Sequence, residues 1–367
     1  MSLDSLGTEV TAVAVAVLSA VALSAGWGRG RTWWKVSFRT ATAVLCLVSA
    51  AASGLLWVNR QVEVYPTWSS LTGANADADT PVTTASPVRG SRNGQIITIS
   101  VAGPASGLTL PVYVYLPPGY RDDAGIRYPV VEALHGYPGS PTHWLKGLHV
   151  LKVLDQEIKA GRMAPTIVLF PYQTPDPLLD TECTNLTGGA QTETYLTRDV
   201  PAAIRARFPV RADAAGWGLI GYSAGGYCAT DLTLRHPGQY TAGASLSGYA
   251  EPGITVGNGT ENTVYNDLWR LKHLPVPAVA LYLAAARADG QPLRDTRALA
   301  RAAHAPLSVT TSYIAGGGHN VQTWQAMEAP AFDWLSTQLG RPVTSTPPPA
   351  AADQSQSPSS LAIAPRV

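Results

Sequence analysis

A serine between closely spaced glycines is the first group in this sequence whose setting suits chemistry. Ser223 stands in "GYSAGG" (221–226), directly after an apolar run and directly before a stretch with helical periodicity, 224–236. The G-x-S-x-G spacing is typical of a nucleophile elbow, because the serine occupies a strained turn and small neighbours let strand and helix nearly touch. An ordinary glycine-rich turn is the alternative, and the flanking strand and helix favour the nucleophile.

A serine hydroxyl alone is a weak nucleophile, so a base and an orienting acid must accompany Ser223. His319 lies on a glycine-rich loop, "GGGHN", after the last predicted strand, whereas the other histidines after Ser223 end a helix or lie in connections. We therefore predict that His319 is the base. The acid is predicted to be Asp289, in the turn-forming "ADG", with Asp295 and Glu251 as alternatives.

Acyl transfer also needs two backbone N–H groups that hydrogen-bond to the oxyanion. The amide of Ala224, the residue after the serine, is predicted to be one of them. The amide of Tyr137 is predicted to be the other, in the loop "HGYPGS" (135–140) that follows an apolar run. A plain type II turn at "YPG" is the alternative interpretation, and such a turn is compatible with either role. We expect His135 to brace this loop rather than to transfer protons.

The elements that must position these residues lie between 93 and 339, where apolar β-branched runs alternate with amphipathic stretches. The pattern predicts an antiparallel opening pair at 95–101 and 110–117. Further strands are predicted at 128–134, 165–171, 217–222, 242–248, 277–285 and 307–314, with helices at 195–208, 224–236 and 323–339. Such alternation indicates an α/β fold with a mostly parallel central sheet and helices on both faces.

Two uncharged apolar stretches precede this unit, at 10–27 and 40–59. Each has nearly the ~20 residues that a helix needs to cross a bilayer. The segment between them holds basic and no acidic residues: Arg29, Arg31, Lys35 and Arg39. The positive-inside rule therefore predicts a hairpin with a cytoplasmic turn and both ends outside. A signal peptide is the alternative, but the segment before Val10 lacks the basic residues typical of one.

The predicted organisation has four parts. Residues 1–59 form a two-helix transmembrane anchor, 60–92 an extracytoplasmic linker, 93–339 the folded α/β domain, and 340–367 a disordered Pro/Ser-rich tail. The folded domain is therefore expected on the outer side of the cell membrane, with the membrane itself as a partner.

The cysteines fit this location. Cys46 lies in the second apolar stretch and is interpreted as an ordinary buried thiol. Cys183 and Cys228 lie in the outer domain, where an isolated pair is more often bridged than free, so we predict a disulfide between them. It would tie the segment at 172–194 to the helix after Ser223. The sequence has no C-x-x-C or H-E-x-x-H, so no metal and no cofactor are expected.

The composition limits the possible partners. Of the 367 residues, 46% are hydrophobic and 14% charged, and 26 basic residues balance 25 acidic ones. The apolar content is sufficient for one large core domain. The near-neutral balance gives no field that would attract a polyanion, so we expect no nucleic-acid partner.

Four motifs together resemble a known family. "HGYPGS", "GYSAGG", "SLSGY" and "GGGHNVQTW" resemble, in their order and spacing, the Putative esterase family of the α/β-hydrolases, which includes esterase D-like enzymes, feruloyl esterases and mycolyltransferases. The resemblance implies an α/β-hydrolase fold and serine-dependent cleavage of carboxylic esters, or acyl transfer to a sugar hydroxyl. By position it implies Ser223 as nucleophile, His319 as base, and Tyr137 and Ala224 as oxyanion donors. It also supports Asp289, although "AARADG" departs from the G-x-x-D form often seen there.

Three functions are compatible with these patterns. The first is a membrane-anchored extracytoplasmic serine esterase that hydrolyses an ester or acyl-lipid substrate through an acyl-enzyme on Ser223. The second is an acyltransferase that moves the acyl group to cell-envelope glycans or lipids, because water and alcohols attack the same intermediate. The third is a non-catalytic scaffold with the hydrolase fold, against which the intact order of Ser, Asp and His argues. "HNVQTW" is similar to mycolyltransferases, whereas "HGYPGS" is more similar to hydrolases.

Overall fold

The structure is a computed structural model that describes residues 6–27, 32–62, 89–122 and 125–344. Arg29 and Arg31 of the predicted cytoplasmic turn lie outside these residues, as do most of the predicted linker and nearly all of the predicted tail.

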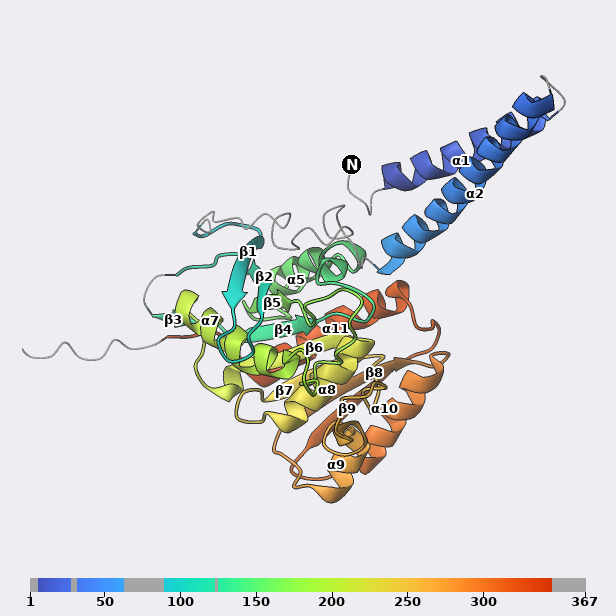
Figure 1. Cartoon of the computed structure of the whole chain (residues 1–367). Coiled ribbons are helices and arrows are strands. Elements are labelled where there is room, and N and C mark those ends of the chain that lie inside the picture. The colour runs from blue at the N-terminus through green and yellow to red at the C-terminus, as the bar shows by residue number, and fades with distance from the viewer. Residues whose placement is uncertain (1–5, 28–31, 63–88, 123–124, 345–367) are drawn as a thin grey trace, which may run out of the picture.

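Two long helices occupy the N-terminal part, α1 (Leu6–Gly26) and α2 (Thr32–Val62). They pack side by side (Figure 1). The second helix begins earlier than its uncharged stretch predicts, so that Lys35 and Arg39 lie within it rather than in a connecting loop. The helices contain apolar spans, Gly7–Gly26 and Trp33–Asn59, that by length and composition could be membrane spans or a signal sequence.

An eight-stranded sheet with the order β1-β2-β5-β4-β6-β7-β8-β9 forms the centre of the main domain. The pairs β1–β2 and β2–β5 are antiparallel, and all neighbours from β5 to β9 are parallel. The strands are β1 (Gln95–Ala102), β2 (Thr109–Leu116), β4 (Val130–Leu134), β5 (Ile167–Pro171), β6 (Trp217–Tyr222), β7 (Ala242–Leu246), β8 (Ala280–Ala286) and β9 (Ser308–Ile314). The sheet confirms the predicted α/β architecture.

Helices cover both faces of this sheet (Figure 1). On one face lie α5 (Val150–Lys159) and α11 (Val321–Leu339), which share a core with the inner strands. The other face is covered by α7 (Val200–Arg207), α8 (Ala224–Arg235), α9 (Asp267–His273) and α10 (Gly290–Ala302). Every residue of β4 to β8 is therefore buried, which explains why these strands are mostly apolar without alternation, with Glu132 and Ser245 as buried polar exceptions.

The predicted helix at 195–208 is divided. A short helix α6 (Thr192–Thr194) leads into a π-helical turn at 195–199, and regular α-helix begins only at α7. The division has a local cause, because Pro201 in the first turn of α7 has no N–H with which to continue a preceding ladder. The Asp199 carboxylate also accepts hydrogen bonds from Ala105 and Ser106, which fixes the turn to the β1–β2 connection.

The folded part also extends slightly past its predicted end. Residues 343–344 form a strand, β10 (Val343–Thr344), that pairs with β3 (Ile126–Arg127). The remaining short turns are a π-helical turn at 143–147 and 3₁₀ turns at 214–216 and 260–262. Because the strands from β5 to β9 run in parallel, their carboxyl ends share one edge of the sheet, where α/β proteins bind their ligands.

Candidate active site

Ser223 occupies a sharp turn between β6 and α8. Its backbone has φ 56° and ψ −124°, a conformation that costs a non-glycine residue about 1–3 kcal/mol. The strand and helix approach so closely that a Cβ on Gly221 would lie 1.9 Å from the Gly225 oxygen. A Cβ on Gly225 would lie 2.2 Å from the Leu134 oxygen. The two glycines are therefore required by the geometry of the turn, as the G-x-S-x-G pattern predicts.

The loops after β8 and β9 bring an acid and an imidazole to this serine. Ser223 Oγ lies 2.8 Å from His319 Nε2, and His319 Nδ1 lies 3.1 Å from Asp289 Oδ2. Asp289 is 4% exposed and immediately precedes α10. The other carboxylates considered from the sequence have different partners, since Asp295 accepts from the Ala250 N–H and Glu251 accepts from an asparagine side chain. The structure thus brings together Ser223, His319 and Asp289.

Two aromatic side chains hold the His319 ring. The Trp324 ring meets it edge-on, with centroids 5.1 Å apart and an interplanar angle of 90°. On another side the Tyr249 hydroxyl lies 3.1 Å from His319 Nε2. Tyr249 is absent from the site predicted from the sequence. A signal for it is its place at the end of "SLSGY", shortly after β7 ends at Leu246, because residues after parallel strands gather at the same edge.

A cavity of about 280 Å³ adjoins Ser223. Its wall is mainly aromatic. It comes from the loops after β4 and β7, from the end of β6 and from α11, through Tyr137, Pro138, His143, Tyr222, Tyr249 and Trp324. Burial lowers the pKa of His143 to about 4, so this imidazole is neutral at physiological pH. Its Nδ1 lies 2.7 Å from the Tyr222 hydroxyl. The cavity wall is therefore uncharged apart from the groups that contact Ser223.

The loop after β4 carries the predicted second oxyanion donor, Tyr137, and it is fixed by Gln173. The His135 N–H donates to Gln173 Oε1, and Gln173 Nε2 donates to the His135 oxygen at 3.0 Å. Burial lowers the pKa of the His135 side chain to about 4, and its Nδ1 lies 2.8 Å from the Gly136 oxygen. Both features agree with a bracing role.

Ala224, the other predicted donor, is the first residue of α8. The N–H groups of a first helical turn point out of the helix end, so that they are available to a ligand.

Cys183 and Cys228 form a disulfide, as predicted, with their Cα atoms 5.7 Å apart. Gln173 Nε2 lies 3.5 Å from Cys183 Sγ and 3.9 Å from Cys228 Sγ. The bridge therefore connects α8, which begins directly after Ser223, with the segment whose Gln173 holds the loop of Tyr137. The Tyr137 hydroxyl also donates to the Leu178 oxygen in this segment, at 2.8 Å.

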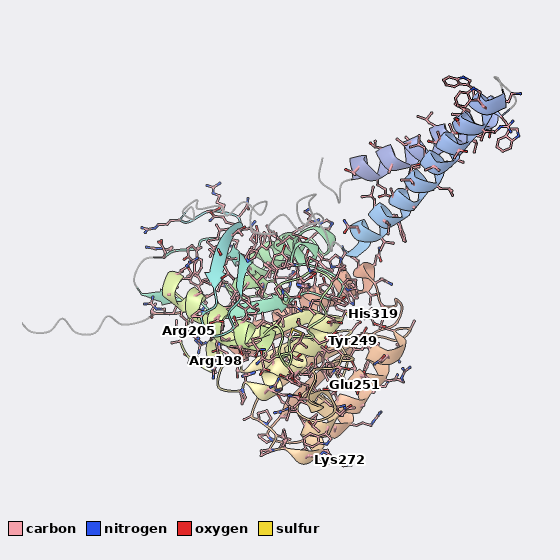
Figure 2. All side chains as sticks on the ribbon, viewed as in Figure 1. Arg198, Arg205, Tyr249, Glu251, Lys272 and His319 are labelled. Atoms are coloured by element: carbon pink, nitrogen blue, oxygen red, sulfur yellow. A yellow bond between two sulfur atoms is a disulfide. The ribbon has the colours of Figure 1, made fainter. Side chains whose placement is uncertain are left out.

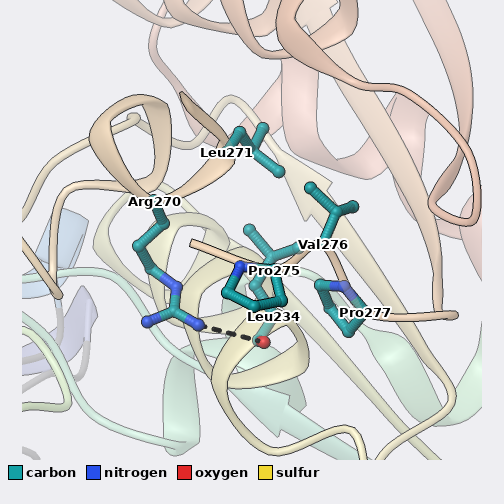
Figure 3. Close-up of a pocket in the computed structure, with 6 residues that line it drawn as sticks. All are labelled: Leu234, Arg270, Leu271, Pro275, Val276 and Pro277. Carbon is teal, nitrogen blue, oxygen red and sulfur yellow. Dashed lines mark hydrogen bonds between the residues drawn. The ribbon is translucent and has the colours of Figure 1, made fainter. Parts of the chain in front are cut away.

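A second hollow lies beside α9 and the C-terminal end of α8 (Figure 3). It is lined by Leu234, Arg270, Leu271, Pro275, Val276 and Pro277. The Arg270 side chain donates across it to the Leu234 oxygen at 3.4 Å, and the space does not accommodate even a water molecule. Among the residues that the structure describes, no group of three or more His, Cys, Asp or Glu side chains could hold a metal ion.

Comparison with known proteins agrees with this architecture. The profile of the family described as "Putative esterase" matches residues 104–332. The chain belongs to this family. An uncharacterized protein of Corynebacterium glutamicum is 27% identical over 343 residues, which cover 85% of this chain and 78% of that protein.

Solved structures of esterases have the same fold. A ferulic acid esterase superimposes with a TM-score of 0.58 at 16% identity, over 68% of this chain and 100% of its own. An S-formylglutathione hydrolase from Agrobacterium tumefaciens superimposes with a TM-score of 0.57 at 14% identity, over 68% and 97%. Membership of the family supports a hydrolase, and these neighbours show that the fold is that of the α/β-hydrolases.

Proposed function

We propose that this chain is a serine esterase that cleaves carboxylic esters through an acyl-enzyme on Ser223. The observation that carries the proposal is the distance of 2.8 Å between Ser223 Oγ and His319 Nε2, with Asp289 at the other imidazole nitrogen. This arrangement is the one that activates a serine in enzymes of acyl transfer.

In the first half-reaction, Ser223 Oγ attacks the ester carbonyl while its proton passes to His319 Nε2. Asp289 accepts the hydrogen bond from Nδ1–H, holds the tautomer and stabilises the imidazolium. The carbonyl oxygen becomes an oxyanion, to which the backbone N–H groups of Tyr137 and Ala224 donate. The alcohol then leaves with the proton from Nε2, and the acyl group remains on the serine.

In the second half-reaction, His319 removes a proton from water, which attacks the acyl-enzyme and releases the acid. An acceptor alcohol would use the same steps, so the arrangement alone is compatible with transfer to a sugar or lipid. The uncharged aromatic cavity next to Ser223 favours an apolar acyl or alcohol group in the substrate.

The proposed location is the outer side of a cell membrane, with α1 and α2 as the anchor. Two features support it. The helices carry apolar spans of sufficient length, and the Cys183–Cys228 disulfide is typical of a protein that folds in an oxidising compartment.

The test uses the full chain in detergent with p-nitrophenyl butyrate, in the presence and absence of trehalose. We expect wild-type protein to release butyrate, and Ser223→Ala and His319→Ala to lose activity by about 10⁴-fold or more. Hydrolysis that persists in Ser223→Ala would contradict the proposal. Acylated trehalose among the products would assign the chain to the transferases instead.

A further inference from the structure

Tyr249 is the one side chain besides Asp289 and Ser223 whose polar atom lies within hydrogen-bond distance of the His319 ring nitrogens, among the contacts of the described residues. Its hydroxyl is 3.1 Å from Nε2, and the two rings lie with centroids 5.8 Å apart at 38°. Figure 2 labels both residues, which come from the loops after β7 and β9. Ser223 Oγ lies 2.8 Å from the same His319 nitrogen. The Ser223 and Tyr249 hydroxyls thus both contact His319 Nε2, at the wall of the cavity.

The order of the strands places Tyr249 and the oxyanion loop on opposite sides of the serine. β6, which ends at the nucleophile, lies between β4 and β7. Tyr137 follows β4, and Tyr249 follows β7. A tetrahedral intermediate on Ser223 whose oxyanion points to the β4 side therefore has room for its leaving oxygen on the β7 side. That oxygen must also lie within reach of Nε2, from which it takes a proton.

We propose that Tyr249 is a catalytic residue whose hydroxyl donates a hydrogen bond to the leaving alcohol oxygen. This inference rests on the proposed esterase function. When the bond between the acyl carbon and the alcohol oxygen breaks, the electron pair moves to that oxygen, and the proton comes from His319 Nε2. Tyr249 keeps its own proton and stabilises the negative charge that develops before proton transfer is complete.

The surroundings keep Tyr249 in the donor form. Burial raises the pKa of its hydroxyl above the ordinary value of 10.0. The nearby Ser223 hydroxyl acts in the opposite direction, and the carboxylates of Asp289 and Glu182 raise the pKa further. The phenol is therefore neutral throughout the physiological range. In the second half-reaction, the Tyr249 hydroxyl can also hydrogen-bond to the water that attacks the acyl-enzyme, because that water must approach Nε2 as the leaving alcohol did.

The test compares butyrate esters that differ only in the leaving group: p-nitrophenyl, phenyl and ethyl. For all three, kcat/KM reports the steps up to acylation, so the shared second half-reaction does not enter. The p-nitrophenolate anion leaves without help, whereas ethanol does not. We expect Tyr249→Phe to lower kcat/KM for the ethyl ester by about tenfold to hundredfold more than for the p-nitrophenyl ester, with the phenyl ester between them.

Two controls separate a specific effect on the leaving group from a general effect of removing a tyrosine hydroxyl. Tyr313→Phe removes a hydroxyl from an exposed tyrosine on β9 and should change none of the three values. Fluorophosphonate labelling of Tyr249→Phe should slow by no more than hydrolysis of the p-nitrophenyl ester does, because fluoride leaves unaided. An equal loss for all three esters, or no loss for any, would overturn the role of Tyr249. A wild-type protein that hydrolyses no ester and takes no label would overturn the proposed function, and this inference with it.

Discussion

Replacement of Gln173 by methionine tests how the oxyanion loop is held. The Gln173 amide accepts from the His135 N–H and donates to the His135 oxygen, and both groups are buried directly before the glycine that precedes Tyr137. Methionine fills a similar volume and makes neither hydrogen bond. Each orphaned buried group costs about 1–3 kcal/mol, so the variant is expected to lose about 2–6 kcal/mol of unfolding free energy.

The expected effect of Gln173→Met on kcat also has an upper bound. Complete loss of one oxyanion donor costs about 10²–10³ in kcat. Because β4 still anchors the loop at one end, we expect Gln173→Met to displace the Tyr137 N–H only in part and to lower kcat by about 10- to 100-fold. KM should change little, since the donor acts mainly on the oxyanion of the transition state.

The assay is steady-state hydrolysis of p-nitrophenyl butyrate, together with thermal unfolding. Gln191→Met is the matched control, because the Gln191 amide likewise makes two hydrogen bonds to the backbone, here as donor to the Leu186 and Gly189 oxygens at 3.0 and 2.9 Å. These bonds lie away from the loop of Tyr137. The control should keep its kcat. A Gln173→Met protein that is destabilised yet keeps the wild-type kcat would refute the reasoning, because Gln173 would then support only the fold.

Three further predictions concern the acid, the elbow and a buried carboxyl. Asp289→Asn is expected to lower kcat by about 10³–10⁴-fold, whereas Asp295→Asn should keep wild-type hydrolysis; equal effects would argue against the assignment of the acid. Gly225→Ala places a Cβ 2.2 Å from a backbone oxygen and should prevent folding, whereas Gly238→Ala, with no atom within 4 Å, should melt like wild type in a thermal unfolding assay. Burial raises the pKa of Glu132 from 4.5 to about 8. Between pH 4.5 and about 8, the carboxyl is therefore protonated in the folded state and ionised in the unfolded chain. Wild-type stability should therefore contain a component that falls as pH rises from about 5 to 8, by at most about 1.4 kcal/mol per pH unit, and Glu132→Gln should lack it. Parallel pH profiles of unfolding free energy for the two proteins would contradict this.

The fold could be predicted largely because its central strands are buried on both faces. Runs such as 217–222 are apolar throughout, and the glycines around Ser223 indicate a close approach that the structure contains. The helix predicted at 195–208 was wrong in its first part, where a π-helical turn replaces regular helix. Periodicity does not reveal this turn, because it depends on Pro201 and on hydrogen bonds from a loop about 94 residues away in sequence.

The candidate site was predictable where a residue type has few chemical uses. Histidine on a glycine-rich loop after the last strand is such a case, and the structure places His319 beside Ser223. Tyr249 and Gln173 could not be assigned, because tyrosine and glutamine have many structural uses and their contacts arise from the order of the strands. The choice between Asp289 and Asp295 likewise depends on where α10 begins. Asp289 directly precedes the helix, whereas Asp295 lies inside the helix.

The central claim is that Ser223 forms a covalent acyl-enzyme, and peptide mapping of the labelled full chain tests it most directly. The protein is treated with a fluorophosphonate, its residual ester hydrolysis is measured, and the adduct is located by mass spectrometry. The account predicts one adduct, on Ser223, whose extent matches the fraction of activity lost, and no adduct in Ser223→Ala. An adduct on another residue, or full activity in a chain whose Ser223 is completely labelled, would contradict it.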